Sequence, residues 1–244
     1  MVMFDTTHIC FLLITIAFLT LSTLAVSRMS ALWQNVMFFL AAFLCAGGIF
    51  FRYGMNLSFD GGFDFKTLAT QMMQVCNFNF ILVILMLIPG CELARQYAVF
   101  FSAAAACTTF VSISGTWANH NWNDLTVINS WCNHVCAVAL PLWMVAARRL
   151  KPKKYYIWQV MGLVFIYFTV SYIVCSILIG AGVLPAGTSF SFLFETGKIG
   201  LLDMLWSLIP VPYFYLYPLM LLLFGFFWVW ARLFRDYKTE LYHL

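Results

Sequence analysis

The stretch that decides the fold is residues 125–154, which read LTVINSWCNHVCAVALPLWMVAA followed by RRLKPKK. The first part contains no Asp, Glu, Lys or Arg, and it is long enough to cross a hydrocarbon layer, which takes about 20 apolar residues. The second part is almost entirely basic, and Pro152 within it cannot continue a helix. The pattern predicts a membrane-spanning helix that ends in a compact basic loop.

Runs of the same kind fill most of the remaining chain. Only 9% of residues are charged, 64% are hydrophobic and mean hydropathy is +0.91, whereas globular domains carry about 25% charged residues. So much apolar surface must face lipid. The sequence therefore predicts an all-α polytopic membrane protein, a bundle of seven transmembrane helices that forms a single domain over residues 1–244. The predicted spans are residues 8–27, 30–51, 72–91, 95–115, 126–147, 156–180 and 206–231.

The basic residues predict the orientation of this bundle. Ten of the 13 Lys and Arg residues fall in the first, third and fifth loops and the C-terminal tail, and three fall on the other side. Positive residues favour the cytoplasmic side of a membrane, so we expect the N-terminus outside and the C-terminus inside. The ten are Arg28, Arg95, Arg148, Arg149, Lys151, Lys153, Lys154, Arg232, Arg235 and Lys238, and the three are Arg52, Lys66 and Lys198.

The composition also limits the kinds of partner and cofactor. The basic residues flank apolar runs instead of forming one basic face, so no nucleic-acid partner is expected. Cys132 and Cys136 are four residues apart with no second pair, which is not a zinc motif, and no metal or other cofactor is predicted. Membrane lipids are the partners that this composition predicts.

Four chemically reactive side chains share the outer half of the predicted bundle, and each comes from a different span. Ionisable groups at membrane depth are costly and therefore indicate function. A histidine about nine residues into the fifth span can exchange protons, and a cysteine becomes a nucleophile when a neighbouring base takes its proton. The four residues are His8, Cys76, His134 and Asp203.

Amide side chains surround these groups in the predicted spans. Gln74, Asn77 and Asn133 are candidates for binding a substrate in an internal cavity, because amides cannot face hydrocarbon unpaired. They fit equally well as hydrogen-bonding groups that hold one helix against another. The sequence leaves both possibilities open.

Short motifs at these positions resemble those of the YwaF-like family of bacterial integral membrane proteins, which is distantly similar to the vertebrate transmembrane protein 164 family of acyltransferases. The cysteine of Gln71–Cys76 and the Asn133-His134 pair fall where the family has a cysteine and a Ser-His pair. Further matches in the same order are Phe4–His8, Gly187–Leu193, Leu201–Asp203 and Pro210–Phe214.

The resemblance implies a membrane-embedded acyl-transfer site in a bacterial cytoplasmic membrane. Cys76 would carry the acyl group, His134 or His8 would act as base, and Asp203 would orient or neutralise a histidine. Ser189 and Tyr213 fall within the motifs that would contact the substrate. We therefore expect a lipid acyltransferase or acyl hydrolase. The alternative is a transporter or channel for a small molecule or ion, with the same polar patch lining the path.

Overall fold

The computed structural model describes residues 6–54, 73–111, 121, 123–185, 188, 191–194, 196 and 200–237. Every regular element in these ranges is helical, which confirms the predicted all-α class. The elements are α1 (Thr6–Arg28), α2 (Ala31–Gly54), α4 (Val75–Leu85), α5 (Glu92–Tyr97), the π-helical segment η1 (Ala98–Ser102), α6 (Ala103–Val111), α7 (Leu125–Ala146), the 3-10 turn η2 (Lys154–Tyr156), α8 (Ile157–Gly180), α9 (Gly200–Leu208), the 3-10 turn η3 (Phe214–Leu216) and α10 (Tyr217–Leu233).

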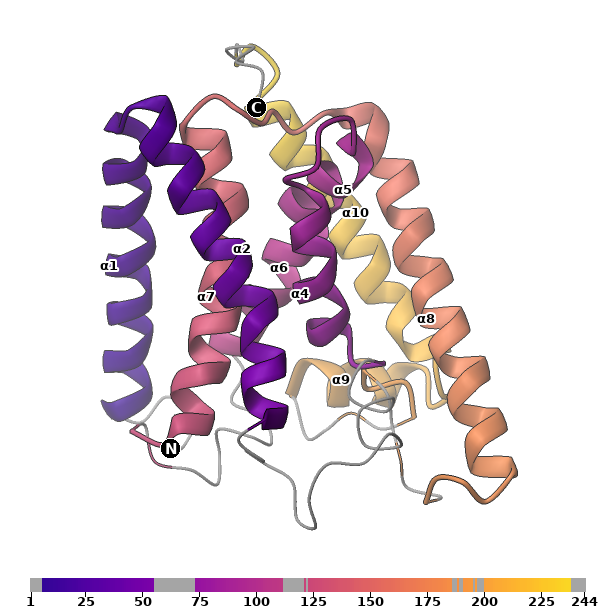
Figure 1. Cartoon of the computed structure of the whole chain (residues 1–244). Helices are drawn as coiled ribbons and strands as arrows, with labels where there is room; N and C mark the ends of the chain where they lie inside the picture. Colours follow the sequence, from indigo (N-terminus) through magenta and orange to yellow (C-terminus); the bar gives the residue numbers. More distant parts are fainter. Residues whose placement is uncertain are drawn as a thin grey trace.

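Five helices in the described ranges are long and apolar enough to cross a membrane: α1, α2, α7, α8 and α10, the last two together with their preceding 3-10 turns. They stand side by side as a bundle, and α9 lies across its lower end (Figure 1). The first of them, α1, begins at the lower end, whereas α10 ends at the upper one (Figure 1). Many of their large apolar side chains are exposed, as expected for helices that face lipid.

The predicted spans at residues 72–91 and 95–115 have a different form. The first contains α4, whose 11 residues cover about 16 Å at 1.5 Å per residue, followed by a turn with Pro89 and a positive φ of 83° at Gly90. The second is α5, η1 and α6 in unbroken succession, with a π-helical segment in the middle. There the backbone N–H of Ala103 donates to the carbonyl of Ala98, five residues earlier.

The last long helix begins later than the predicted span at residues 206–231. It starts at Tyr217, and α9 is a separate short helix that ends at Leu208. Pro210 and Pro212 lie between the two helices. Proline lacks the N–H that a helix needs and disfavours helical geometry in the preceding residue, so the apolar run breaks here.

Helix α7 lies at the centre of the first half of the bundle and contacts α1, α2, α4 and α6. Two tryptophans attach it to α1: the indole of Trp131 donates to the hydroxyl of Thr15 (2.8 Å), and that of Trp143 donates to the hydroxyl of Ser22 (3.0 Å). These bonds satisfy polar groups that lipid could not. Helix α1 has three buried residues in all, and Thr15 is one of them.

The contact between α2 and α7 depends on Gly48. A Cβ atom at this position would lie 1.8 Å from the nearest terminal atom of the Asn133 amide, far inside van der Waals distance. The missing side chain therefore lets the two helices approach closely, as small residues commonly do in membranes. The amide of Asn129 donates to the Gly48 carbonyl (3.1 Å), and Cys45 contacts the Asn133 carbonyl.

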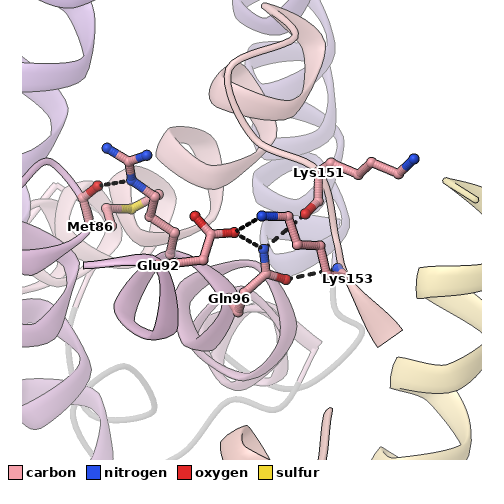
Figure 2. A network of polar contacts seen from close by, with 6 residues as sticks. Met86, Glu92, Gln96, Lys151 and Lys153 are labelled. Atoms are coloured by element: carbon pink, nitrogen blue, oxygen red, sulfur yellow. Dashed lines mark hydrogen bonds and ion pairs between the residues drawn. The ribbon is translucent and has the colours of Figure 1, made fainter. Parts of the chain in front are cut away.

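A polar network ties the basic loop after α7 to α5 (Figure 2). The fully buried amide of Gln96 donates to Glu92 (2.8 Å) and to the Lys151 carbonyl (2.8 Å), and it accepts from the Lys153 backbone N–H (2.9 Å). The ammonium of Lys153 pairs with Glu92 at 2.7 Å. Arg95 donates to the carbonyl of Met86 (2.9 Å). The loop thus has a defined conformation against the bundle.

Candidate functional site

His8 lies near the start of α1 and points into the protein. Its side chain is completely buried, on a helix that otherwise faces mostly outward. Its Nε2 lies 2.8 Å from the carbonyl oxygen of Phe110 at the end of α6. A carbonyl only accepts, so this nitrogen carries the proton, and Nδ1 holds the lone pair when the ring is neutral. His8 therefore connects α1 to α6.

His134 lies near the middle of α7 and is also buried. Its Nδ1 donates to the Ser130 carbonyl one turn earlier (2.7 Å), which leaves Nε2 as the basic nitrogen of the neutral ring. The ring packs edge-to-face on Phe80 of α4 (4.9 Å between centroids) and against Phe110 (6.3 Å). Phe110 thus contacts both histidines, through its carbonyl and its ring respectively, so the structure brings them to one residue.

Cys76 is the second residue of α4 and is partly buried. One helical turn later, about 6 Å along the axis, Phe80 makes the ring contact with His134. Cys76, the candidate nucleophile, and Phe80, which packs on the candidate base His134, therefore lie on adjacent turns of α4.

The start of α4 is held by a residue far away in the sequence, Ser191. Its hydroxyl accepts from the backbone N–H of Val75 (2.7 Å), and its own N–H donates to the side chain of Gln74 (2.9 Å). Tyr167 adds a bond from its hydroxyl to the Met73 carbonyl (2.6 Å). Ser191 thus caps a helix whose N-cap residue, Gln74, makes no capping bond of its own.

Ser191 is a site residue that the sequence alone does not indicate. It lies two residues after the predicted Ser189, which is outside the described residues. Ser191 and Phe192 have positive φ angles of 49° and 64°, which non-glycine residues adopt at a cost. No local pattern marks a cap that comes from more than 100 residues away. The one sequence feature that includes Ser191 is the Gly187–Leu193 motif.

The predicted amides lie in three different environments. Gln74 contacts Ser191 at the start of α4, beside Cys76. Asn77 is buried in the first turn of the same helix. Asn133 faces α2: with its amide nitrogen toward the neighbouring carbonyls, it donates to Asn129 (3.3 Å) and Leu44 (3.1 Å). Gln74, the N-cap residue, and Asn77, in the first turn, are therefore the two that lie at the start of α4 with Cys76.

Tyr213 and Asp203 belong to a second cluster, beside α9. Tyr213 is buried, its N–H donates to the Leu193 carbonyl (2.8 Å), and its hydroxyl bonds to that of Thr169 (2.7 Å). Asp203 is exposed on α9 and accepts from the Thr196 hydroxyl. Tyr213 thus bonds to Leu193, two residues after Ser191. Among the described residues, the side-chain partner of Asp203 is Thr196 and not a histidine.

Comparisons with known proteins identify no relative. No family model, curated protein or solved structure matches the chain. Within the described residues, no group of three or more His, Cys, Asp or Glu side chains is arranged to hold a metal ion. The candidate site consists of the side chains of Cys76, His134 and His8. Gln74, Tyr167 and Ser191 support the start of α4 beside Cys76.

Proposed function

We propose that the protein is a membrane-embedded enzyme that transfers or hydrolyses a lipid acyl chain, with Cys76 as its nucleophile. The observation that carries this proposal is the position of Cys76 in the first turn of α4. The dipole of a helix favours an anion near its start, here the thiolate. Ser191, Gln74 and Tyr167 hold this turn in place.

His134 is the proposed base. The basic Nε2 takes the thiol proton of Cys76, and the thiolate attacks the ester carbonyl of a lipid. The C–O bond of the ester then breaks, and the departing alcohol takes the proton from His134. The resulting thioester is cleaved by water or by the hydroxyl group of an acceptor, which restores the thiol. The resemblance to the YwaF-like family implies the same assignment of roles, with His8 as the second histidine.

The proposed topology has seven crossings, with the N-terminus outside and the C-terminus inside a bacterial cytoplasmic membrane. The five long helices supply five crossings, α4 supplies one, and the continuous segment α5–η1–α6 supplies another. Ten of the 13 basic residues then face the cytoplasm.

Reporter fusions test this topology. A reporter fused to the C-terminus should be active only if the reporter works in the cytoplasm, and one fused to the N-terminus only if it works outside the cell. A cytoplasmic N-terminus would contradict this topology.

A transporter is the second candidate, and one feature of the fold favours it. The short α4 packs against the π-helical segment η1, so two adjacent helices depart from regular spanning form. Interrupted helices of this kind often hold substrates or ions in transporters, and π-helical segments often mark functional sites. The same polar groups around Cys76 would then line a path.

Reconstitution into liposomes separates the two functions. We expect the protein to change the acyl composition of its lipids, measured by mass spectrometry, and His134→Gln to slow this change by about 10²- to 10⁴-fold, as loss of a general base does. The neutral amide keeps a polar side chain of similar size at this buried position. Flux of a solute across the liposome membrane without any lipid turnover would support transport and reject the enzyme.

A further inference from the structure

A polar groove lies between the α1–α2 turn and the end of α7. These two segments are at the end of the bundle opposite to the start of α1 (Figure 1). The volume of the groove is about 520 Å³, within the range of small-molecule sites. Two of its eight lining residues are arginines, and none is acidic. The lining residues are Ser27, Met29, Ala31, Gln34, Ala146, Ala147, Arg148 and Arg149.

The backbone at Arg148 is in a conformation that glycine normally adopts. Its φ is 59°, and its N–H donates to the Val145 carbonyl (3.0 Å), while that of Arg149 donates to Met144 (2.8 Å). This is the pattern of bonds that ends many helices with a left-handed glycine. A residue with a Cβ atom adopts this conformation only at an energetic cost. The strained residue is one that lines the groove, and such strain is found at ligand sites.

The opposite wall is built by Gln34, which is buried. Its amide donates to the carbonyls of Val26 (3.3 Å) and Met29 (3.1 Å), and these bonds close the C-terminal end of α1. The groove is therefore shaped by hydrogen-bonded backbone on both sides. An ordered wall of this kind can hold a ligand in one orientation.

Exposed apolar side chains lie on α1 and α2, the helices that flank one side of the groove. Leu32 and Trp33 of α2 are 70% and 60% exposed, and Leu24 near the end of α1 is 50% exposed. A ligand that suits this surface combines an anionic group, which matches the two arginines, with an apolar part, which matches the exposed faces of α1 and α2. A phospholipid has both properties, whereas a free phosphate has only the first.

We propose that this groove binds the phosphate headgroup of an anionic phospholipid. Arg148 and Arg149 contact the phosphate oxygens, because a guanidinium presents paired N–H donors that match phosphate geometry. The acyl chains lie along the exposed faces of α1 and α2. Basic pockets at the ends of membrane helices are suited to such headgroups. The groove is about 30 Å from His8 along α1, so this site does not depend on the proposed enzyme activity.

The test uses the full-length protein in a neutral detergent, titrated with phosphatidylglycerol or phosphatidylcholine and followed by thermal unfolding and native mass spectrometry. We expect phosphatidylglycerol to raise Tm and phosphatidylcholine to have little effect. Arg148→Gly should weaken phosphatidylglycerol binding about tenfold, while Tm without lipid stays equal or rises because the backbone strain is relieved. Arg149→Gln should weaken binding to a similar degree.

Lys154→Gln is the matched control, since it removes an exposed positive charge from the same loop outside the groove. Its affinity for phosphatidylglycerol should stay within about twofold of the wild type, as for an exposed charge. Equal losses in Arg148→Gly and Lys154→Gln would show diffuse surface attraction and overturn the site. Equal binding of phosphatidylglycerol and phosphatidylcholine would also overturn the site. The same holds if inorganic phosphate raises Tm as much as phosphatidylglycerol does.

Discussion

Replacing Cys76 with alanine is expected to abolish lipid acyl turnover while leaving the fold intact. The thiol is the proposed carrier of the acyl chain, so its loss removes the covalent step and should lower the rate about 10³-fold or more. The side chain is only partly buried and small, and the bonds that hold the start of α4 come from Ser191, Gln74 and Tyr167. Purified variant in liposomes, assayed by mass spectrometry of the lipids, measures this.

Cys107→Ala is the matched control. Cys107 is exposed on α6, so its substitution should change neither turnover nor Tm. An unchanged Tm for Cys76→Ala would show that lost turnover reflects chemistry. Turnover by Cys76→Ala at the wild-type rate would contradict the proposed nucleophile, whatever the behaviour of the control.

Gly48→Ala is expected to destabilise the protein by about 3 kcal/mol, because the new methyl group has no room. Its Cβ would lie 1.8 Å from the nearest terminal atom of the Asn133 amide and 2.6 Å from Cγ of the same side chain. Asn133 is buried, and its amide bonds to the carbonyls of Asn129 and Leu44, so it cannot turn away without losing these bonds. Thermal unfolding in detergent should show a markedly lower Tm.

The neighbouring residue provides a strict comparison. A Cβ at Gly47 would meet its nearest neighbour, Phe43, at 3.9 Å, an ordinary contact. Gly47→Ala should therefore leave Tm equal or slightly higher, since alanine favours helix over glycine. Combining Gly48→Ala with Asn133→Ala should restore part of the lost stability by removing the clash. Equal Tm values for the two glycine variants would contradict the close α2–α7 contact.

The long helices were predictable from uncharged runs because membrane length and apolar composition leave few other structures. The predicted span at residues 156–180 corresponds to α8 at Ile157–Gly180 within one residue at its start. The same criterion failed at residues 206–216, where the run is apolar but Pro210 and Pro212 interrupt the helix. It also could not detect η1, since a π-helical segment changes hydrogen bonding without changing hydropathy.

The candidate site was predictable as a set of residue types and depths, not as a set of contacts. Helical spacing and depth indicated His8 and His134, and the structure brings both to Phe110. Which neighbour a given face meets depends on the packing of helices far apart in the sequence. That is why Asn133, predicted beside a substrate, lies against Gly48, and why the cap from Ser191 was not foreseen.

Detection of an acyl group on Cys76 is the most direct test of the proposed covalent mechanism. Wild-type protein incubated with a phospholipid carrying an isotope-labelled acyl chain should yield, by peptide mass spectrometry, a labelled thioester on Cys76 that neutral hydroxylamine removes. His134→Gln should accumulate this label far more slowly. Label on a different cysteine, or lipid turnover with no label on any cysteine, would contradict the proposed mechanism.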